Sequence, residues 1–257
     1  MKILVSDFDG VICNGLAEYF YSSKLVYQKI WQNHSPSWQE LQKQFNILRP
    51  VVETGWEMPL LLKVLSEGET VNHILNNWQE VREKAIITIE KEGITVKKLI
   101  QLLDEVRETQ IRENLQDWLS LHSFYDGVID TLKRLIEKQI KLYIVTTKSK
   151  SFTRELLEKQ GIILPENAII GKESKCPKYE TIGNIIKEEK VNFEDVYFIE
   201  DRLEALELVY QQPDLQAIKL YLALWGYNTY LVKEKAQQLP YINSLSLAQF
   251  PELIDIC

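Results

Sequence analysis

Residues 1–15 read MKILVSDFDGVICNG, and this stretch raises the question of why two acids follow a strand so closely. A short apolar run at residues 3–5 leads into two aspartates, Asp7 and Asp9, with Gly10 directly after them. In an extended chain, side chains two residues apart point to the same side, so the two carboxylates share one small volume. Two negative charges that close repel each other unless something positive lies between them. The stretch therefore predicts either an ordinary turn after a strand or a site for Mg2+ and a phosphate.

The composition indicates a chain with a large buried core and sets limits on its partners. The 257 residues are 45% hydrophobic, which suits one domain with an insertion, or two domains. A charged fraction of 26% and a net charge of -7 argue against a nucleic-acid partner. No apolar stretch reaches the roughly 20 residues of a membrane span, and because the first residues already resemble a strand we expect no signal peptide. The three cysteines, Cys13, Cys176 and Cys257, are far apart and indicate a reducing compartment. We therefore expect a cytoplasmic protein without a membrane partner, either a monomer or a homodimer.

The middle of the chain is helical in pattern. From about Leu16 to Leu121, strand signals give way to a helical periodicity. Ser37 and Glu40 form a capping-box pattern ahead of one helix. Apolar residues fall on one helical face within 71–81 and again within 96–106. A stretch of roughly 100 residues that is nearly all helical, set inside an α/β chain, predicts an inserted cap domain.

From Tyr125 on, helices and strands alternate. Strands are predicted at 141–147, 167–171, 195–201 and 215–226, with amphipathic helices between them. Repeated βα units imply a parallel sheet covered by helices, and such sheets bind ligands at the carboxyl ends of their strands. The predicted fold is therefore α/β. A Rossmann-like, doubly wound parallel sheet forms the core (1–14 and 125–257), and an all-helical cap domain is inserted in it (15–124).

Polar residues stand at the predicted carboxyl ends of these strands or in the first turn of the helix that follows. They are Asp7 and Asp9, Thr146 and Thr147, Lys175 and Lys178, and the acids Glu200, Asp201 and Glu204. Mg2+ commonly takes one or two carboxylates together with substrate phosphate and waters. Threonine and lysine can hold the remaining phosphoryl oxygens. The sequence therefore predicts a Mg2+ and phosphate site at this edge of the sheet.

Four motifs, in this order, resemble those of the haloacid dehalogenase superfamily. They are DFDGV, YIVTTK, a lysine within KESKCPKYETI, and FIEDRLE. The insertion between the first two motifs resembles the helical type 1 cap of that family. The stretch LWGY at 224–227 is similar to one that is common in phosphoglycolate-phosphatase-like members. The resemblance covers the whole predicted core, and the cap matches in position and helical character.

This resemblance implies a Mg2+-dependent phosphatase that acts on a small phosphorylated metabolite. In the family the first aspartate, here Asp7, is the nucleophile and becomes an aspartyl phosphate. The second, Asp9, protonates the leaving oxygen and then deprotonates the attacking water. Thr146 and Lys178 match the family's catalytic threonine and lysine, with Lys175 as the rival lysine. The core motifs leave two alternatives open, a phosphomutase of the same superfamily and a non-catalytic binding or regulatory protein that kept the fold.

The fourth motif departs from the family pattern. Most members have glycine before the metal-binding aspartate, whereas this chain has Glu200. The resemblance implies Asp201 as a metal ligand together with Asp7 and Asp9. Glu200 is then a second ligand from this motif or a group outside the ligand shell. Glu204 either holds a metal-bound water or is a solvated acid in the first turn of a helix.

Substrate selection in such proteins comes from the cap. The segment 46–60, NILRPVVETGWEMPL, interrupts a helical region and carries Arg49, Glu53 and Trp56. We expect these three residues, with Thr147 of the core, to contact the substrate. The alternative is a connection between helices, with solvated charges and a packed tryptophan.

Overall fold

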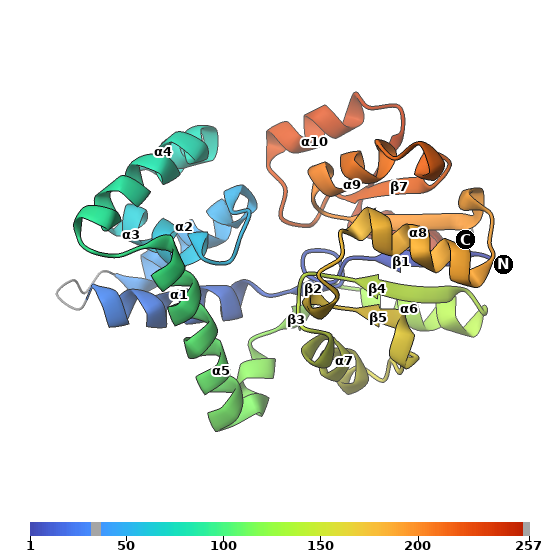
Figure 1. The fold of residues 1–257 in the computed structure, drawn as a ribbon, viewed down its shortest axis with the longest axis horizontal. Helices are drawn as coiled ribbons and strands as arrows, with labels where there is room; N and C mark the ends of the chain where they lie inside the picture. Colours follow the sequence, from blue (N-terminus) through green and yellow to red (C-terminus); the bar gives the residue numbers. More distant parts are fainter. Residues whose placement is uncertain (32–36, 254–257) are drawn as a thin grey trace. The chain divides into compact units, whose positions relative to one another are not determined.

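A computed structural model describes residues 1–31 and 37–253, so Cys257 lies outside the described residues. The chain divides into two compact units (Figure 1). The first, here named the α/β unit, consists of Met1–Asn14 and Ser123–Cys257. The second, named the helical unit, consists of Gly15–His122.

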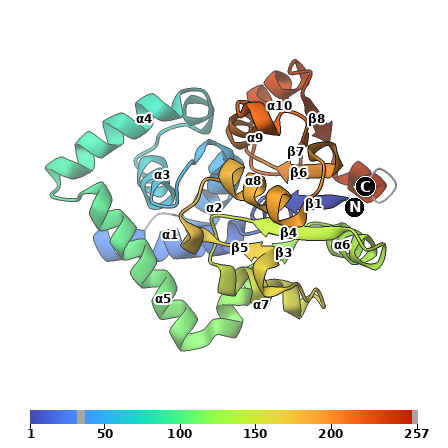
Figure 2. The same cartoon turned by 45° about the vertical axis from the view of Figure 1, so that its right-hand side comes forward.

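Among the described residues, six strands form one parallel sheet in the order β5-β4-β1-β6-β7-β8 (Figure 2). Their bounds are β1 (Ile3–Ser6), β4 (Lys141–Val145), β5 (Ile169–Ile170), β6 (Val196–Glu200), β7 (Lys219–Ala223) and β8 (Ile242–Leu245). All residues of β1 and β6 are buried, as expected for central strands covered on both faces. The predicted doubly wound parallel sheet is confirmed.

The order of the strands creates a switch point beside β1. The chain runs from β1 outward to β4 and β5, and then returns to β6 on the other side of β1. β1 and β6 pair in parallel, with Ser6 opposite Ile199. Their carboxyl ends therefore lie side by side, at the position where open α/β sheets bind ligands.

Helices follow the strands in the α/β unit. They are α6 (Val128–Glu137), α7 (Lys150–Lys159), α8 (Lys178–Glu189), α9 (Leu203–Tyr210) and α10 (Tyr230–Gln237). Short 3-10 helices are η2 (Glu166–Ala168), η3 (Lys172–Ser174), η4 (Phe193–Asp195), η5 (Pro213–Leu215) and η6 (Leu247–Glu252). The strands β2 (Cys13–Asn14) and β3 (Ser123–Phe124) form a separate antiparallel pair. The last helix and strand, α10 and β8, were not among the elements predicted from the sequence.

The helical unit is built from α1 (Leu16–Ile30), α2 (Trp38–Leu48), η1 (Arg49–Val51), α3 (Glu57–Ser66), α4 (Val71–Lys91) and α5 (Val96–Ser120). Helix α3 is buried over most of its length and packs against α1, α2 and α4, so it forms the centre of this core. Thr70 and Thr95 cap α4 and α5 through their side chains. Helix α2 begins after Ser37 as predicted, but the Ser37 side chain makes no capping bond. Within the described part of the chain, no helix has the length and apolar character needed to cross a membrane.

Candidate active site

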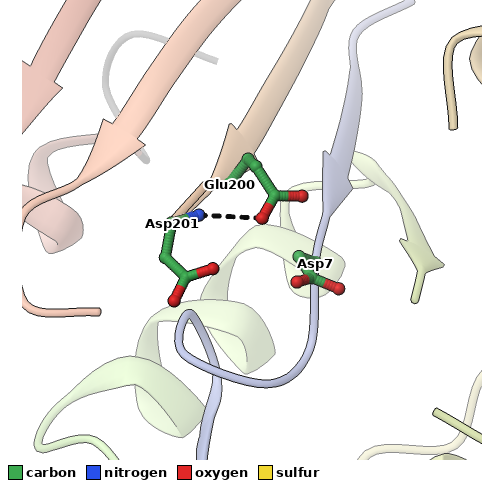
Figure 3. A group of neighbouring side chains, drawn as sticks. All are labelled: Asp7, Glu200 and Asp201. Carbon is green, nitrogen blue, oxygen red and sulfur yellow. Dashed lines mark hydrogen bonds between the residues drawn. The ribbon is translucent and has the colours of Figure 1, made fainter. Parts of the chain in front are cut away.

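Three carboxylates meet at the switch point of the sheet. Asp7 follows β1, Glu200 ends β6, and Asp201 comes next in the chain (Figure 3). One carboxylate oxygen from each lies within 4.8 Å of the others. The exposed fractions of the residues are 7% for Asp7, 0% for Glu200 and 2% for Asp201. The pairing of β1 with β6 therefore concentrates negative charge in a place that water hardly reaches.

A lysine joins this cluster. The Nζ atom of Lys178 lies 3.0 Å from Oδ1 of Asp7 and 2.6 Å from Oε2 of Glu200. Lys178 is the first residue of α8, so the start of that helix brings the ammonium group to the ends of the strands. Lys175 lies at the end of η3 and is exposed. The structure thus brings Lys178 to Asp7, and Lys175 points to solvent.

Glu200 uses both of its carboxylate oxygens. Oε1 accepts hydrogen bonds from the backbone N–H groups of Asp201 and Arg202, each at 3.1 Å. Oε2 accepts from Lys178. Charge-assisted hydrogen bonds of this kind hold the carboxylate in one orientation and stabilise its negative charge. In this arrangement Glu200 anchors the ammonium group of Lys178 beside Asp7.

Asp201 is held by the loop that follows β7. Its Oδ2 atom accepts a hydrogen bond from the backbone N–H of Tyr227 at 2.6 Å. The amide of Asn228 donates to the carbonyl of Asp201 at 3.3 Å and to that of Ala223 at 2.8 Å. The side chain of Asp201 is therefore held by Tyr227 of the LWGY stretch, and its backbone carbonyl by Asn228, the next residue.

Two glycines allow this loop to approach the first motif. Gly10 has a φ of +86°, and a Cβ atom there would lie 2.0 Å from Oδ2 of Asp201. A Cβ atom on Gly226 would lie 2.5 Å from the carbonyl oxygen of Gly10 and 2.3 Å from Cβ of Asp201. The indole N–H of Trp225 also donates to the carbonyl of Val11 at 3.0 Å. Any larger side chain at either glycine would displace the backbone that positions Asp201.

Asp9 has a different partner from Asp7. Its carboxylate accepts from Nζ of Lys148, at 3.1 Å for Oδ1 and 3.4 Å for Oδ2, and it is not one of the three clustered carboxylates. Thr146, which directly follows β4, is buried, and its hydroxyl oxygen accepts from the backbone N–H of Lys148 at 3.1 Å. Lys148 was not among the site residues predicted from the sequence. The available signal was its position in YIVTTK, just beyond the end of a buried strand.

Two other predicted site residues lie outside this group. Thr147 is exposed. The side chain of Glu204, in the first turn of α9, is 64% exposed and lies 3.7 Å from Arg202. Among the described residues, no hydrogen bond or ion pair joins Thr147 or Glu204 to the three clustered carboxylates.

The residues predicted to contact substrate from the cap lie in the helical unit. The guanidinium of Arg49 lies 5.1 Å from the ring centroid of Tyr19 and donates to the carbonyl of Val52 at 3.1 Å. Glu53 is exposed, and Trp56 is half-buried just before α3. A contact of Arg49, Glu53 or Trp56 with substrate stays a prediction.

The same segment is held together by a buried acid, Glu57. Its carboxylate accepts from the indole N–H of Trp78 and the hydroxyl of Thr54, both at 2.9 Å, and from Arg82 at 3.2 Å. The backbone N–H of Glu53 adds a bond at 3.2 Å. Glu57 therefore organises the break between helices that the sequence revealed.

The electrostatics of the α/β site reflect burial and crowding. Burial and the charge of Glu200 outweigh the attraction of Lys178 and raise the pKa of Asp7 from 3.8 to about 7. Burial, with Asp201 next to it, also raises the pKa of Glu200. Burial alone would lower the pKa of Lys178, but Asp7 and Glu200 outweigh it, so the pKa of this ammonium group is raised.

The donor set fits a hard divalent cation. Carboxylate oxygens are the ligands that Mg2+ prefers, and one or two of them suffice when phosphate and water complete the shell. Asp7, Asp9, Glu200 and Asp201 carry four negative charges when ionised, and in the described part of the chain the ammonium groups of Lys148 and Lys178 form ion pairs with members of this set. One divalent cation would balance this excess of negative charge.

The fold is a doubly wound α/β sheet, and its candidate active site consists of carboxylates and a lysine at the switch point. This combination is typical of an α/β hydrolytic enzyme. Residues 1–207 match the family model of the haloacid dehalogenase-like hydrolases, and the chain belongs to this family. The resemblance seen in the four motifs is thereby confirmed. A search of curated proteins finds no match to the chain.

Solved structures of this fold align over the whole chain. A haloacid dehalogenase-like family hydrolase of Streptococcus pneumoniae is 13% identical with a TM-score of 0.62, covering 100% of this chain and 99% of that one. A protein of Haemophilus somnus described as a predicted phosphoglycolate phosphatase is 15% identical with a TM-score of 0.63, covering 100% and 97%. A predicted phosphatase of Clostridium acetobutylicum is 15% identical with a TM-score of 0.60, covering 100% and 99%. At these identities the likeness establishes the fold.

Proposed function

We propose that this hydrolase is a Mg2+-dependent phosphatase that acts on a small phosphorylated metabolite. The observation that carries the proposal is the position of Asp7, buried at the switch point between Lys178 and the carboxylate of Asp201. Membership of the hydrolase family and the phosphatase descriptions of similar structures support it. We further assign the protein to the cytoplasm, as a monomer or a homodimer.

In the proposed reaction Asp7 is the nucleophile. One of its oxygens forms a bond to phosphorus while the ester P–O bond breaks, and the leaving oxygen takes a proton from the carboxyl group of Asp9. A water molecule then attacks phosphorus, gives its proton to the Asp9 carboxylate, and the bond between Asp7 and phosphorus breaks. Thr146 and Lys178 hold phosphoryl oxygens throughout.

Asp7, Asp9 and Asp201 are the residues assigned to hold Mg2+, and Glu200 is assigned as a further ligand or as a group outside the ligand shell. When bound, the ion supplies positive charge that stabilises the transferring phosphoryl group. Glu204 is the acid assigned to a water of the ion. The structure gives Glu200 a second task, because it keeps the Lys178 ammonium group in place beside the nucleophile.

Substrate selection is assigned to the helical unit acting as a cap. Arg49, Glu53 and Trp56 are the candidates there, and Thr147 is the candidate in the α/β unit. Arg49 is the strongest of the four chemically, because a guanidinium group binds carboxylate and phosphate groups with two parallel hydrogen bonds.

The test is phosphate release from a panel of phosphorylated metabolites, with Mg2+, with EDTA, and with the variant Asp7→Asn. We expect release that needs Mg2+ and falls at least about a thousandfold in Asp7→Asn, because a carboxamide cannot form the acyl phosphate. Release that persists in Asp7→Asn would contradict the proposal. Phosphoryl exchange between isomers without release would instead identify a phosphomutase.

A further inference from the structure

The two aspartates of the first motif are paired with two different lysines. Lys178 lies against Asp7 and is also held by Glu200. Lys148 lies against Asp9, and its ammonium group reaches both oxygens of that carboxylate. The proposed reaction gives Lys178 a task on the phosphoryl group and leaves Lys148 without one.

Backbone contacts hold Lys148 in its position. Its N–H donates to the hydroxyl oxygen of Thr146, and its carbonyl accepts from the N–H of Lys172 at 3.0 Å. A Cβ atom on Gly171 would lie 2.8 Å from this same carbonyl oxygen, so a larger residue there would displace one of the two loops. The side chain is only 9% exposed. An ordinary surface ion pair has none of these constraints.

The pairing with Asp9 also conflicts with the task of Asp9. A carboxylate that accepts hydrogen bonds from an ammonium group on both oxygens is an acceptor, whereas the proposed reaction needs Asp9 to donate a proton to the leaving oxygen. Asp9 can donate a proton once at least one of its oxygens is released from the ammonium group, and a second anion nearby would favour that release. A phosphoryl group carries three strongly accepting oxygens, and a lysine can turn toward a new partner on its flexible four-carbon stem.

We propose that Lys148 is a second lysine ligand of the phosphoryl group. Without substrate its ammonium group pairs with Asp9, and when substrate binds it moves to a phosphoryl oxygen. The proposal deepens the proposed phosphatase function and rests on it. It makes Asp9 available for proton transfer only when a phosphoryl group has arrived. Lys178 stays beside Asp7 because Glu200 holds it, so both lysines bind the phosphoryl group but only Lys148 changes its partner.

The first experiment measures binding of inorganic phosphate to the Mg2+-loaded protein by calorimetry. In Lys148→Met we expect affinity to fall about tenfold or more, because a charge-assisted bond to phosphate is lost. Lys148→Gln serves as a second variant that keeps a polar side chain, and it should show the same loss. Lys150→Met is the matched control, since Lys150 is two residues along and pairs with Glu166, away from the acids. Unchanged phosphate affinity in both Lys148 variants, with folded protein and normal Mg2+ affinity, would overturn the proposal.

The second experiment compares leaving groups. A ligand of the phosphoryl group contributes to every ester, so kcat/KM of Lys148→Met should fall by a similar factor for p-nitrophenyl phosphate and for an alkyl phosphate. A loss confined to the alkyl phosphate, which depends most on the general acid, would mean that Lys148 only positions Asp9, and would overturn the proposal. If the wild-type protein releases no phosphate from any ester, the phosphatase proposal fails. The phosphate-binding comparison still decides the role of Lys148.

Discussion

At the scale of single residues, Asp7 makes the stability of the metal-free protein depend on pH. Its pKa is raised from 3.8 to about 7, so the folded state holds a proton that the unfolded chain has released between about pH 4 and pH 7. The contribution of Asp7 to the free energy of unfolding is therefore most favourable below pH 4. It declines as the pH rises and is lowest above pH 7. We expect a loss on the order of 4 kcal/mol across this window from this carboxyl group.

Denaturant unfolding in EDTA at pH 5 and at pH 7.5 measures the larger part of this loss. Asp7→Asn is the control, because an amide does not titrate and should reduce the difference between the two pH values. Mg2+ should also reduce it, since a bound cation offsets the cost of an ionised Asp7. Equal pH dependence in the wild type and in Asp7→Asn would show that other groups are responsible.

The residues that the sequence identified are those whose role follows from position in the chain. Asp7 and Lys178 come at a strand end and at a helix start, and a parallel sheet brings such positions together. Lys148 also follows a strand end, but its pairing with Asp9 does not follow from that position alone, because the orientation of its side chain depends on how two loops pack. The role of Glu200 was ambiguous for a similar reason, because a buried carboxylate can bind either a metal ion or an ammonium group.

At the scale of elements, the loop after β7 is the support of Asp201, and Gly226 is its tightest point. We expect Gly226→Ala to destabilise the protein by about 1–3 kcal/mol, because the new methyl group would lie 2.5 Å from the carbonyl oxygen of Gly10. It should also weaken Mg2+ binding, since the same loop fixes the carboxylate of Asp201. Calorimetry with Mg2+ and denaturant unfolding measure the two effects.

Gly183→Ala is the matched control for this substitution. Gly183 lies in α8, and a Cβ atom there would meet its nearest neighbour, Leu215, at 3.9 Å, which is an ordinary contact. This variant should be neutral or more stable by up to about 1 kcal/mol, because alanine favours helix more than glycine does. If Gly226→Ala retained full Mg2+ affinity, the loop after β7 would not be the support of Asp201.

Elements with a strong apolar signal were predicted, and those without one were not. The strands β1, β4 and β6 are central, and their runs of apolar residues stand out in the sequence. The strand β8 is at the edge of the sheet, and its four residues, INSL, include Asn243 and Ser244. An edge strand needs less apolar surface, so its sequence resembles a loop.

At the scale of the whole molecule, the helical unit contains a buried ion pair of its own. Its stability can therefore be changed without altering the carboxylates of the α/β unit. Arg107 of α5 donates to both oxygens of Glu18 of α1, at 2.7 and 2.9 Å, and Glu18 is only 1% exposed. Arg107→Met would remove the cation from a buried carboxylate. We expect a loss of about 3 kcal/mol in the free energy of unfolding, because an uncompensated buried charge is costly.

The same two helices provide the control. Lys29 of α1 and Glu105 of α5 form an ion pair whose side chains are 45% and 60% exposed, so Lys29→Met should cost less than about 1 kcal/mol. Both variants should retain the Mg2+ affinity of the wild type, since the clustered carboxylates and their lysine all belong to the α/β unit. Calorimetric titration with Mg2+ at a temperature where each variant is folded makes the comparison. A fall in affinity that follows the loss of stability in Arg107→Met, and is absent in Lys29→Met, would mean that the acid cluster is formed only when the helical unit is intact.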